Sequence, residues 1–325
     1  MSKLLEIKDL NVQFNMRHDT IYAVNGVNLH VNECETLGIV GESGSGKSVS
    51  MMSILGLVPT PPGEIKSGTA MFKGTDLLTL TPQQLRKYQG NRIGMIFQDP
   101  MTSFNPVLSI GRQMIEALEW HMRMGKSEAY EKATHMLDLV GIPNASQRIK
   151  EFPHQFSGGM RQRAMIAMAL ICEPELLIAD EPTTALDVTI QAQIVELVLE
   201  LQQKLKMSVI WITHDLAVVA RLSDRVCVMY GGRVVEQAEV LELYENPNHP
   251  YTKGLLASLP SENKGEELKT IQGVPPLLKE KPKGCTFAKR CAYADEKCFM
   301  EVPEMYDLGN NHYTCCRLGS QVGRI

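Results

Sequence analysis

The chain has 325 residues, a formal net charge of −4 and 44% hydrophobic residues, which leaves room for one large α/β domain and an appendage. No window approaches about 18 uninterrupted apolar residues, and the amino terminus lacks a long apolar segment with a cleavage site. We therefore expect no transmembrane helix and no secretory signal, and a chain that remains in the cytosol. The acidic balance gives no electrostatic footprint for nucleic acid.

Apolar patterning predicts strands and helices in alternation. The expected strands are 4–14, 21–31, 36–40, 69–72, 93–97, 176–179, 209–213, 226–230 and 234–237. A helical pattern covers 110–140, and it includes a second helix at about 127–140. A further helix is expected to begin at Ser157, and a long amphipathic helix at 189–205. Strands that alternate with helices imply a parallel sheet covered on both faces.

The stretch from Gly41 to Ser48 matches the phosphate-binding P-loop pattern G-x-x-x-x-G-K-[ST]. Glycines suit this loop because successive backbone N–H groups must turn inward around an anion, and the helix starting near Lys47 adds the positive end of its dipole. Lys47 can reach the β- and γ-phosphates, and the Ser48 hydroxyl can bind Mg²⁺. A chance glycine-rich turn is the alternative, which the flanking strand and helix disfavour. The expected ATP-binding residues of the loop are Gly41, Ser43, Gly44, Ser45, Gly46, Lys47, Ser48 and Val49.

Asp180 and Glu181 follow the apolar run LLIA at 176–179. Their carboxylates are therefore expected at the carboxyl edge of the sheet, beside the P-loop. Asp180 can hold the Mg²⁺ that bridges the phosphates, directly or through water. Glu181 can polarise the water that attacks the γ-phosphate. The alternative is a solvated strand end without a chemical role.

Together these residues resemble an ATP-binding-cassette (ABC) ATPase, from about residue 4 to residue 237. FSGGM at 156–160 is similar to the family's signature stretch, usually LSGGQ. The resemblance implies that this stretch acts on the ATP of a second subunit, with Ser157 as the N-cap of its helix. Met160 departs from the usual glutamine, but the Ser-Gly-Gly core is intact. The residues concerned are Ser157, Gly158, Gly159 and Met160.

The resemblance assigns roles to four further residues. It implies that Gln98 contacts Mg²⁺ and the lytic water, and that His214 contacts the γ-phosphate. Asp187 ends Ala185-Leu186-Asp187, which matches a loop that crosses the dimer interface. Tyr22 lies 25 residues before Lys47, where the family has an aromatic residue that stacks on adenine. Simple packing of a strand tyrosine is an equally good interpretation.

The same resemblance implies partners. Two cassettes must stack head to tail around two ATP molecules, and hydrolysis separates them. NPNHPYT at 246–252 and FQDPMTSFNP at 97–106 are similar to segments of bacterial dipeptide and oligopeptide importers. That branch implies a second cassette, commonly a paralogue, two membrane permease subunits, an external solute-binding protein and a location on the cytoplasmic face of the bacterial inner membrane. Importers of nickel or glutathione remain an alternative, and a soluble ABC ATPase acting on nucleic acid or ribosomes is less favoured.

Five of the eight cysteines lie in the last 41 residues. In a reducing cytosol this density favours metal or cluster ligation over disulfides. Four thiolates suit zinc and a 4Fe–4S cluster equally by softness, and the spacings fit neither a zinc ribbon nor a plant ferredoxin. The irregular gaps and the resemblance to the tail of peptide importers favour iron–sulfur, while Cys315 as the fourth ligand, zinc and free thiols remain alternatives. The favoured ligands are Cys285, Cys291, Cys298 and Cys316.

We therefore expect an α/β fold with a P-loop ATPase core on a parallel sheet, an N-terminal antiparallel β subdomain, a helical insertion and a small cysteine-rich C-terminal extension. The expected parts are an ATPase domain at 1–245 with a helical subdomain at about 105–170, a proline-rich extension at 246–283 and a cysteine-rich module at 284–325.

Overall fold

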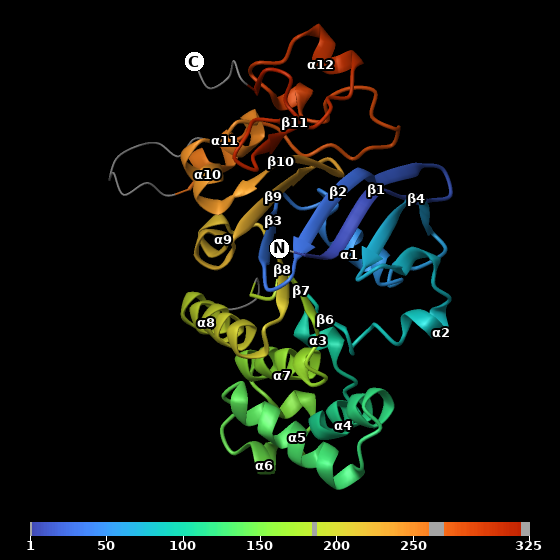
Figure 1. Cartoon of the computed structure of the whole chain (residues 1–325), viewed down its shortest axis with the longest axis vertical. Helices are drawn as coiled ribbons and strands as arrows, with labels where there is room; N and C mark the ends of the chain where they lie inside the picture. The colour runs from blue at the N-terminus through green and yellow to red at the C-terminus, as the bar shows by residue number, and fades with distance from the viewer. Residues whose placement is uncertain (1, 184–186, 260–269, 320–325) are drawn as a thin grey trace. The chain divides into compact units, whose positions relative to one another are not determined.

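The computed structural model describes residues 2–183, 187–259 and 270–319, and the chain divides into two compact units (Figure 1). Unit 1 comprises residues 1–79 and 212–325, and unit 2 comprises residues 80–211. Ala185 and Leu186 of the predicted dimer loop lie outside the described residues, as do 260–269 of the proline-rich stretch. Among the described residues, no helix combines the length and the apolar character that crossing a bilayer requires.

The elements of unit 1 fall into an N-terminal and a C-terminal series. The first series is β1 (Lys3–Asn15), β2 (Thr20–Asn32), β3 (Thr36–Val40), α1 (Lys47–Ile54), β4 (Gly63–Phe72), β5 (Thr75–Asp76) and the 3₁₀ turn η1 (Leu77–Thr79). The second series is α9 (Leu216–Leu222), β9 (Arg225–Tyr230), β10 (Arg233–Glu239), α10 (Val240–Glu245), α11 (Pro250–Ala257), η3 (Ala288–Arg290), α12 (Glu296–Met300), β11 (Tyr306–Asp307) and β12 (Tyr313–Thr314).

The N-terminal strands of unit 1 form an antiparallel sheet in the order β2-β1-β4-β5. This confirms the predicted N-terminal antiparallel β subdomain. The apolar alternation of β1 breaks at Asp9, which has a φ of 45° and lies where the register with β4 shifts. Opposite this irregularity lies Gly68, where a Cβ atom would come within 2.7 Å of the Leu10 Cα. The polar and irregular first half of β4 explains why the apolar pattern predicted only 69–72.

β3 and the C-terminal strands of unit 1 belong to a second sheet, in which they follow the order β11-β12-β10-β9-β3. β3 pairs in parallel with β9, and the predicted closing hairpin of β9 and β10 is confirmed. Its turn contains Gly231 and Gly232, both with positive φ, and a Cβ atom at Gly231 would lie 2.7 Å from the Thr286 Cβ. The turn therefore requires glycine for two reasons: its backbone has positive φ, and the C-terminal region approaches it closely.

The region after β10 packs onto this sheet through aromatic side chains. Tyr251 at the start of α11 is fully buried, and its ring centroid lies 4.6 Å from that of Tyr230 and 5.4 Å from that of Phe287. The three rings belong to one apolar cluster with Val40 of β3 and Val228 of β9. Aromatic residues of this size dominate core energetics, so the C-terminal region shares a hydrophobic core with the strand that precedes the P-loop.

A buried polar contact also holds this region. Glu236 of β10 is fully buried, and its carboxylate accepts hydrogen bonds from the backbone N–H groups of Asn248 (2.6 Å) and His249 (2.9 Å). The His312 Nε2 lies 2.7 Å from Glu236 Oε1, and its Nδ1 lies 3.4 Å from Glu242 Oε1. Burial acts to lower the pKa of His312, but the hydrogen bonds and charges of Glu236 and Glu242 outweigh it, so this pKa is raised above its ordinary value.

This contact predicts a pH-dependent stability. A raised folded-state pKa stabilises the fold fully below the unfolded pKa of about 6.5, and the effect is lost as the pH rises through the folded-state value. We expect His312→Gln to lower the free energy of unfolding, and to lower it more at low pH than at high pH. The difference between the two pH values should be about 1.4 kcal/mol for each unit by which folding raises the pKa of His312. Urea titrations at about pH 6 and about pH 9 measure this. The control is His18→Gln at an exposed site. If the loss of unfolding free energy caused by His312→Gln grew as the pH rises, this would contradict a stabilising contact between protonated His312 and the two glutamates.

Unit 2 contains a pair of parallel strands and most of the long helices. Its elements are α2 (Pro82–Leu85), β6 (Ile93–Ile96), α3 (Pro100–Ser103), α4 (Ile110–His121), α5 (Lys126–Leu139), α6 (Ala145–Arg148), η2 (Pro153–Gln155), α7 (Gly158–Leu170), β7 (Leu176–Asp180), α8 (Val188–Leu205) and β8 (Ser208–Thr213), whose last residues belong to unit 1. β6 and β7 pair in parallel, with Ile93 opposite Leu176 and Ile96 opposite Ala179.

Helix packing in unit 2 follows the predicted apolar faces. Ile110, Met114 and Leu118 of α4 are fully buried, and Ser109 caps this helix by accepting a hydrogen bond from the Arg112 N–H. Two separate helices, α4 and α5, replace the continuous pattern from 110 to 140, as predicted. With the parallel strands and the helical segment, the predicted α/β class is confirmed.

Candidate functional site

The P-loop connects β3 to α1 in unit 1. All five residues of β3 are buried, and Gly46 forms the N-cap of α1 with a φ of 95°. A Cβ atom at Gly41 would lie 2.2 Å from the Met229 carbonyl oxygen, and one at Gly46 would lie 2.6 Å from the Ala23 carbonyl oxygen. Gly44 has open space around it and a φ of 78°. Backbone conformation and crowding therefore require glycine here, and the loop has the geometry of an anion cradle.

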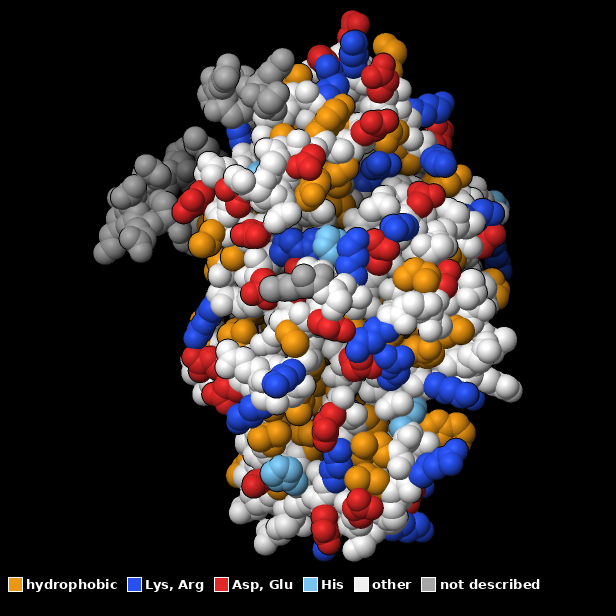
Figure 2. Space-filling view, viewed as in Figure 1, with side chains coloured by type: hydrophobic (Ala, Val, Ile, Leu, Met, Phe, Trp, Pro, Cys, Tyr) orange, Lys and Arg blue, Asp and Glu red, His pale blue; other side chains and the backbone are white. Residues whose placement is uncertain are grey.

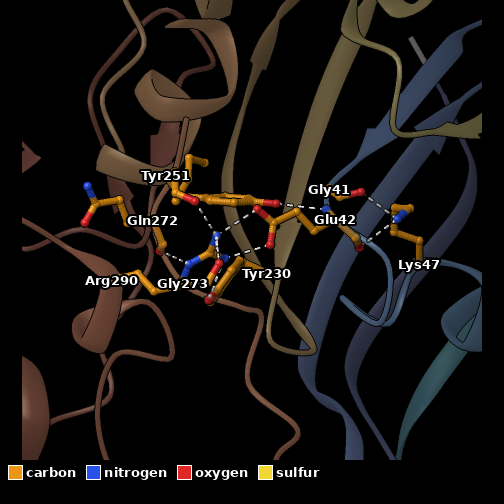
Figure 3. A network of polar contacts seen from close by, with 9 residues as sticks. Gly41, Glu42, Lys47, Tyr230, Tyr251, Gln272, Gly273 and Arg290 are labelled. Atoms are coloured by element: carbon orange, nitrogen blue, oxygen red, sulfur yellow. Dashed lines mark hydrogen bonds and ion pairs between the residues drawn. The ribbon is translucent and has the colours of Figure 1, made fainter. Parts of the chain in front are cut away.

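Lys47 is held against this loop. Its side chain is buried, and its Nζ donates hydrogen bonds to the carbonyl oxygens of Gly41 (2.7 Å) and Glu42 (3.0 Å), which Figure 3 shows. Nζ also lies 3.5 Å from the Ser45 Oγ. The ammonium group is thus fixed at the mouth of the loop, beside the amides that would surround a phosphate.

Tyr22 and His214 are the other two candidate residues of unit 1. Tyr22 lies in β2 and is half-buried, and its backbone N–H donates a hydrogen bond to the Leu278 carbonyl oxygen (2.9 Å). His214 directly follows β8 and is exposed. Behind it, the Asp215 carboxylate caps α9 by accepting from the backbone N–H groups of Ala217 and Val218. This cap fixes the backbone that carries the His214 imidazole.

Unit 2 brings Gln98 and Glu181 together. Asp180 is the last residue of β7 and is buried, and Glu181 follows it. Gln98 comes two residues after β6, so the parallel pairing of β6 with β7 carries both side chains to the same strand ends. The Gln98 Nε2 donates a hydrogen bond to Glu181 Oε2 (3.3 Å). The sequence pattern predicted that Glu181 lies at the carboxyl edge of the sheet. The assignment of Gln98 to the site came from the family resemblance.

The backbone of Glu181 is unusual. Its φ of 44° lies in the left-handed region, which costs a residue with a side chain about 1–3 kcal/mol. Such strain persists only where the surrounding structure requires it. Here it turns the chain directly after a buried strand and aims the carboxylate at Gln98.

The signature stretch opens α7. The predicted N-cap is confirmed, because the Ser157 Oγ accepts a hydrogen bond from the Met160 N–H (3.3 Å). Phe156 is buried and anchors the turn, whereas Ser157 and Gly158 are exposed. The positive end of a 13-residue helix is therefore presented to the outside. Asp187 similarly caps α8 by accepting from the Ile190 N–H (2.9 Å), and it is exposed.

The five C-terminal cysteines line one cavity, which also touches His249 and Phe287. Burial raises the pKa of Cys285 and of Cys316 to about 11, and the pKa of Cys316 also rises through interaction with Cys285, Cys291 and Cys298. The Cys315 thiol differs, since it lies 3.9 Å from the Met305 Sδ and interacts with Arg233 instead.

The cavity tests whether a metal fits. Cys285 and Cys298 are joined by a backbone hydrogen bond of 2.7 Å, which keeps two of the predicted ligands adjacent. Among the described residues, no three His, Cys, Asp or Glu side chains gather closely enough to hold one metal ion. The arrangement of the described thiols therefore does not support the predicted metal or cluster site.

Sequence reasoning missed three residues near these sites. His249, which the sequence analysis names only within the stretch NPNHPYT, is buried, caps α11 by accepting from the Tyr251 N–H, and lines the cysteine cavity. Arg290 and Glu42 form an ion pair between the cysteine-rich region and the P-loop. No local pattern marks this pair, because 248 residues separate its members.

Comparisons with known proteins agree with this geometry. A family model described as ABC transporter matches residues 24–184, and one described as Oligopeptide/dipeptide transporter, C-terminal region, matches residues 235–298. The chain is similar to the Oligopeptide transport ATP-binding protein OppD of Bacillus subtilis (strain 168), at 52% identity over 96% of this chain and 88% of the relative. It is also similar to the Dipeptide transport ATP-binding protein DppD of the same organism, at 50% identity over 99% of this chain and 96% of that relative.

The chain is also similar to a solved structure of an ATP-binding cassette. The dimeric structure of a post-hydrolysis state of the ATP-binding cassette MJ0796, bound to ADP and Pi, superposes with a TM-score of 0.65 at 28% identity. The match covers 73% of this chain and 98% of that one.

Proposed function

Because this chain belongs to the ATP-binding proteins of the ABC transporter family, whose members are ATPases, we propose that it powers a bacterial importer of dipeptides or oligopeptides. The observation that carries the proposal is the match along almost the entire chain to peptide transport ATP-binding proteins. The C-terminal match at 235–298 extends this similarity beyond the cassette itself. Cargo in such systems is selected by other subunits, so the proposal concerns the energy source of import.

The P-loop supplies the ATP site of this proposal. Its amides and Lys47 bind the β- and γ-phosphates, and Tyr22 stacks on adenine. Ser48, Gln98 and Asp180 offer hydroxyl, amide and carboxylate oxygens, which are the hard donors that Mg²⁺ prefers. The bound Mg²⁺ would neutralise developing charge on the phosphates.

Glu181 takes the role of general base. Its carboxylate accepts the proton of the attacking water, and the hydrogen bond from Gln98 restricts the direction in which the carboxylate points. His214 contacts the γ-phosphate and stabilises the charge that develops there. Support comes from the family membership and from the strand-end positions of these residues in their own units.

A second cassette completes the site. We expect the exposed N-terminus of α7, with Ser157 and Gly158, to bind the γ-phosphate held by a partner, and Asp187 to lie at the same interface. The dimeric state of the solved neighbour supports this arrangement. The partner is a paralogous cassette, and the pair works with two membrane permease subunits and, indirectly, an external solute-binding protein at the cytoplasmic face of the inner membrane.

Nucleic acid is not among the expected partners. On the face shown in Figure 2, Lys and Arg side chains are interspersed with Asp and Glu side chains. Proteins that bind nucleic acid concentrate positive charge along a patch or stripe. The net charge of −4 agrees with this distribution.

We assign the cysteine cavity to a 4Fe–4S cluster. Zinc binds sulfur at about 2.3 Å, so four zinc ligands must lie within about 5 Å of one another. The described cysteines line one cavity but do not gather in this way, so their arrangement favours neither a cluster nor zinc, and the proposal rests on the resemblance of this tail to that of peptide importers. A bound cluster would supply four metal–thiolate bonds that cross-link the C-terminal loops. The proposed ligands, taken from the resemblance, are Cys285, Cys291, Cys298 and Cys316.

Uptake of a labelled dipeptide tests the proposed cargo. Deletion of the gene for this chain from its host is expected to abolish ATP-dependent uptake, and re-expression of the wild-type chain to restore it. The Lys47→Ala chain is the matched control, because it lacks the phosphate-binding ammonium and should not restore uptake. Loss of nickel uptake with unchanged peptide uptake would contradict the peptide cargo. Purification of the tagged chain with ribosomes, without permease subunits, would contradict the importer.

A further inference from the structure

Glu42, the second residue of the P-loop, is held by the C-terminal region (Figure 3). The Arg290 guanidinium donates to both carboxylate oxygens, from Nη1 to Oε2 (2.7 Å) and from Nη2 to Oε1 (3.1 Å). The backbone N–H of Glu42 donates to the hydroxyl oxygen of Tyr251 (2.8 Å). One residue of the phosphate-binding loop is thus fixed through its side chain and its backbone by two residues that lie more than 200 positions later.

The Arg290 side chain is itself held rigidly. It is 8% exposed, against 25% for Glu42. Its remaining N–H groups donate to the carbonyl oxygens of Gln272 (2.9 Å), Ile271 (3.2 Å) and Gly273 (3.2 Å), and Nη1 also donates to the Tyr230 hydroxyl (3.2 Å). A planar guanidinium with its donors satisfied in this way presents a fixed fork to the carboxylate. The pair is therefore a geometric restraint on the loop, unlike an exposed ion pair between two mobile side chains.

The restraint extends to the phosphate-binding lysine. The peptide that joins Gly41 to Glu42 donates its N–H to Tyr251, and its carbonyl oxygen accepts from the Lys47 Nζ at 2.7 Å. Since the peptide unit is planar and trans, its N–H and C=O groups point in opposite directions. Holding the N–H toward Tyr251 therefore aims the carbonyl oxygen at Lys47. The next carbonyl, of Glu42, also accepts from Nζ (3.0 Å).

A separate contact reaches the strand that carries the adenine-stacking candidate. The backbone N–H of Tyr22 in β2 donates to the carbonyl oxygen of Leu278 (2.9 Å), and the adjacent Lys279 forms an ion pair with Asp19 (2.7 Å). The C-terminal region thus contacts both segments of unit 1 that are expected to bind ATP, the P-loop and the β2 strand. The two contacts involve different residues and different loops.

We propose that Tyr251 and Arg290 are positioning residues for ATP binding, which hold Glu42 so that the P-loop keeps its phosphate-binding shape and Lys47 its direction. Neither residue touches the nucleotide in this proposal. The C-terminal region then does more than complete the fold, because it sets the affinity of the cassette for ATP. This inference rests on the proposed ATP-binding role of the P-loop.

The test compares ATP affinity among variants of the full chain. Displacement of a fluorescent nucleotide analogue by ATP gives the dissociation constant, and the assembled transporter gives KM and kcat. We expect Arg290→Gln to weaken ATP binding by about tenfold and to raise KM more than it lowers kcat. Arg290→Lys keeps the charge without the fork and should restore part of the affinity. Adding Glu42→Gln to Arg290→Gln should cost less than the sum of the single effects, as expected for residues in direct contact.

A second buried ion pair of unit 1 provides the matched control. Arg225 and Glu35 are 2.8 Å apart, and their side chains are 9% and 6% exposed. Arg225 pairs with the beginning of β3, at the end opposite to the P-loop. Arg225→Gln should lower the melting temperature and leave ATP affinity unchanged. The same result for Arg290→Gln, a lower melting temperature with wild-type affinity, would overturn the proposal.

Two further measurements keep the outcome decisive. If Arg290→Gln does not fold, Tyr251→Phe replaces it, since this change removes one hydroxyl and preserves the buried ring; affinity equal to wild type would then refute the positioning role. If the wild-type chain itself binds no ATP, the proposed function fails and this inference with it. Wild-type binding together with unaffected variants refutes the positioning role alone.

Discussion

Replacement of Glu181 by glutamine is expected to lower the rate of ATP hydrolysis by about 10²- to 10⁴-fold, the usual contribution of a general base. Glutamine has the size of glutamate and can still accept the hydrogen bond that the Gln98 Nε2 donates to residue 181. It cannot accept the proton of the attacking water. ATP therefore binds without being cleaved, and we expect the closed, ATP-bound pair of cassettes to accumulate. Phosphate release measures the rate, and size-exclusion chromatography with ATP and Mg²⁺ measures the closed state.

A glutamate elsewhere in unit 2 provides the control for this experiment. Glu173 shares the left-handed backbone of Glu181, with a φ of 54°, and its carboxylate forms an ion pair with Lys132 (2.7 Å). Glu173→Gln therefore reports what the same change does at a strained glutamate on the surface, and it should leave turnover near the wild-type rate. Wild-type turnover in the Glu181→Gln protein would show that Glu181 is not the base.

Replacement of Cys316 by serine is expected to remove most of the iron from the protein. A 4Fe–4S cluster needs four thiolates, and a serine hydroxyl is a harder and weaker ligand for iron–sulfur chemistry. Wild-type protein purified without oxygen should contain about four iron atoms per chain and show broad absorbance around 400 nm. Metal analysis and the absorbance spectrum of the two proteins measure the loss.

Cys315→Ser provides the matched control, one position away. The Cys315 thiol contacts Met305, and the resemblance favours Cys316 as the fourth ligand, so iron content should be retained in the Cys315 variant. The reverse pattern would move the fourth ligand to Cys315. If the wild-type protein were colourless and contained one zinc ion per chain, the site would be assigned to zinc and the cluster proposal would be wrong.

The local parts of the site could be predicted because their signals are local. The P-loop glycines, the buried strand before Asp180 and the N-cap at Ser157 each follow from a few consecutive residues, and each lies in the structure where the pattern predicts. Gln98 was different, since the only residue-level clue was that it follows an apolar strand. The parallel pairing of β6 with β7 is what brings it to Glu181.

The contacts of the C-terminal region could not be predicted. The proline-rich sequence from 246 onward suggested a linker or an irregular extension, yet α11 contains the fully buried Tyr251. Prolines report the local backbone and carry no information on burial against distant strands. The pairing of Arg290 with Glu42 likewise depends on tertiary structure, because 248 residues separate the two in the sequence.

The short strand β12 has a practical consequence for work on this protein. It pairs with β10 at Glu236 and Gln237, on the side of β10 that does not face β9. Truncating the chain after β10 would expose the backbone donors and acceptors of β10 that pair with β12. Exposed edge strands can pair with strands of other chains. A shortened cassette prepared for biochemistry should therefore self-associate, and its kinetics would describe aggregates instead of the enzyme.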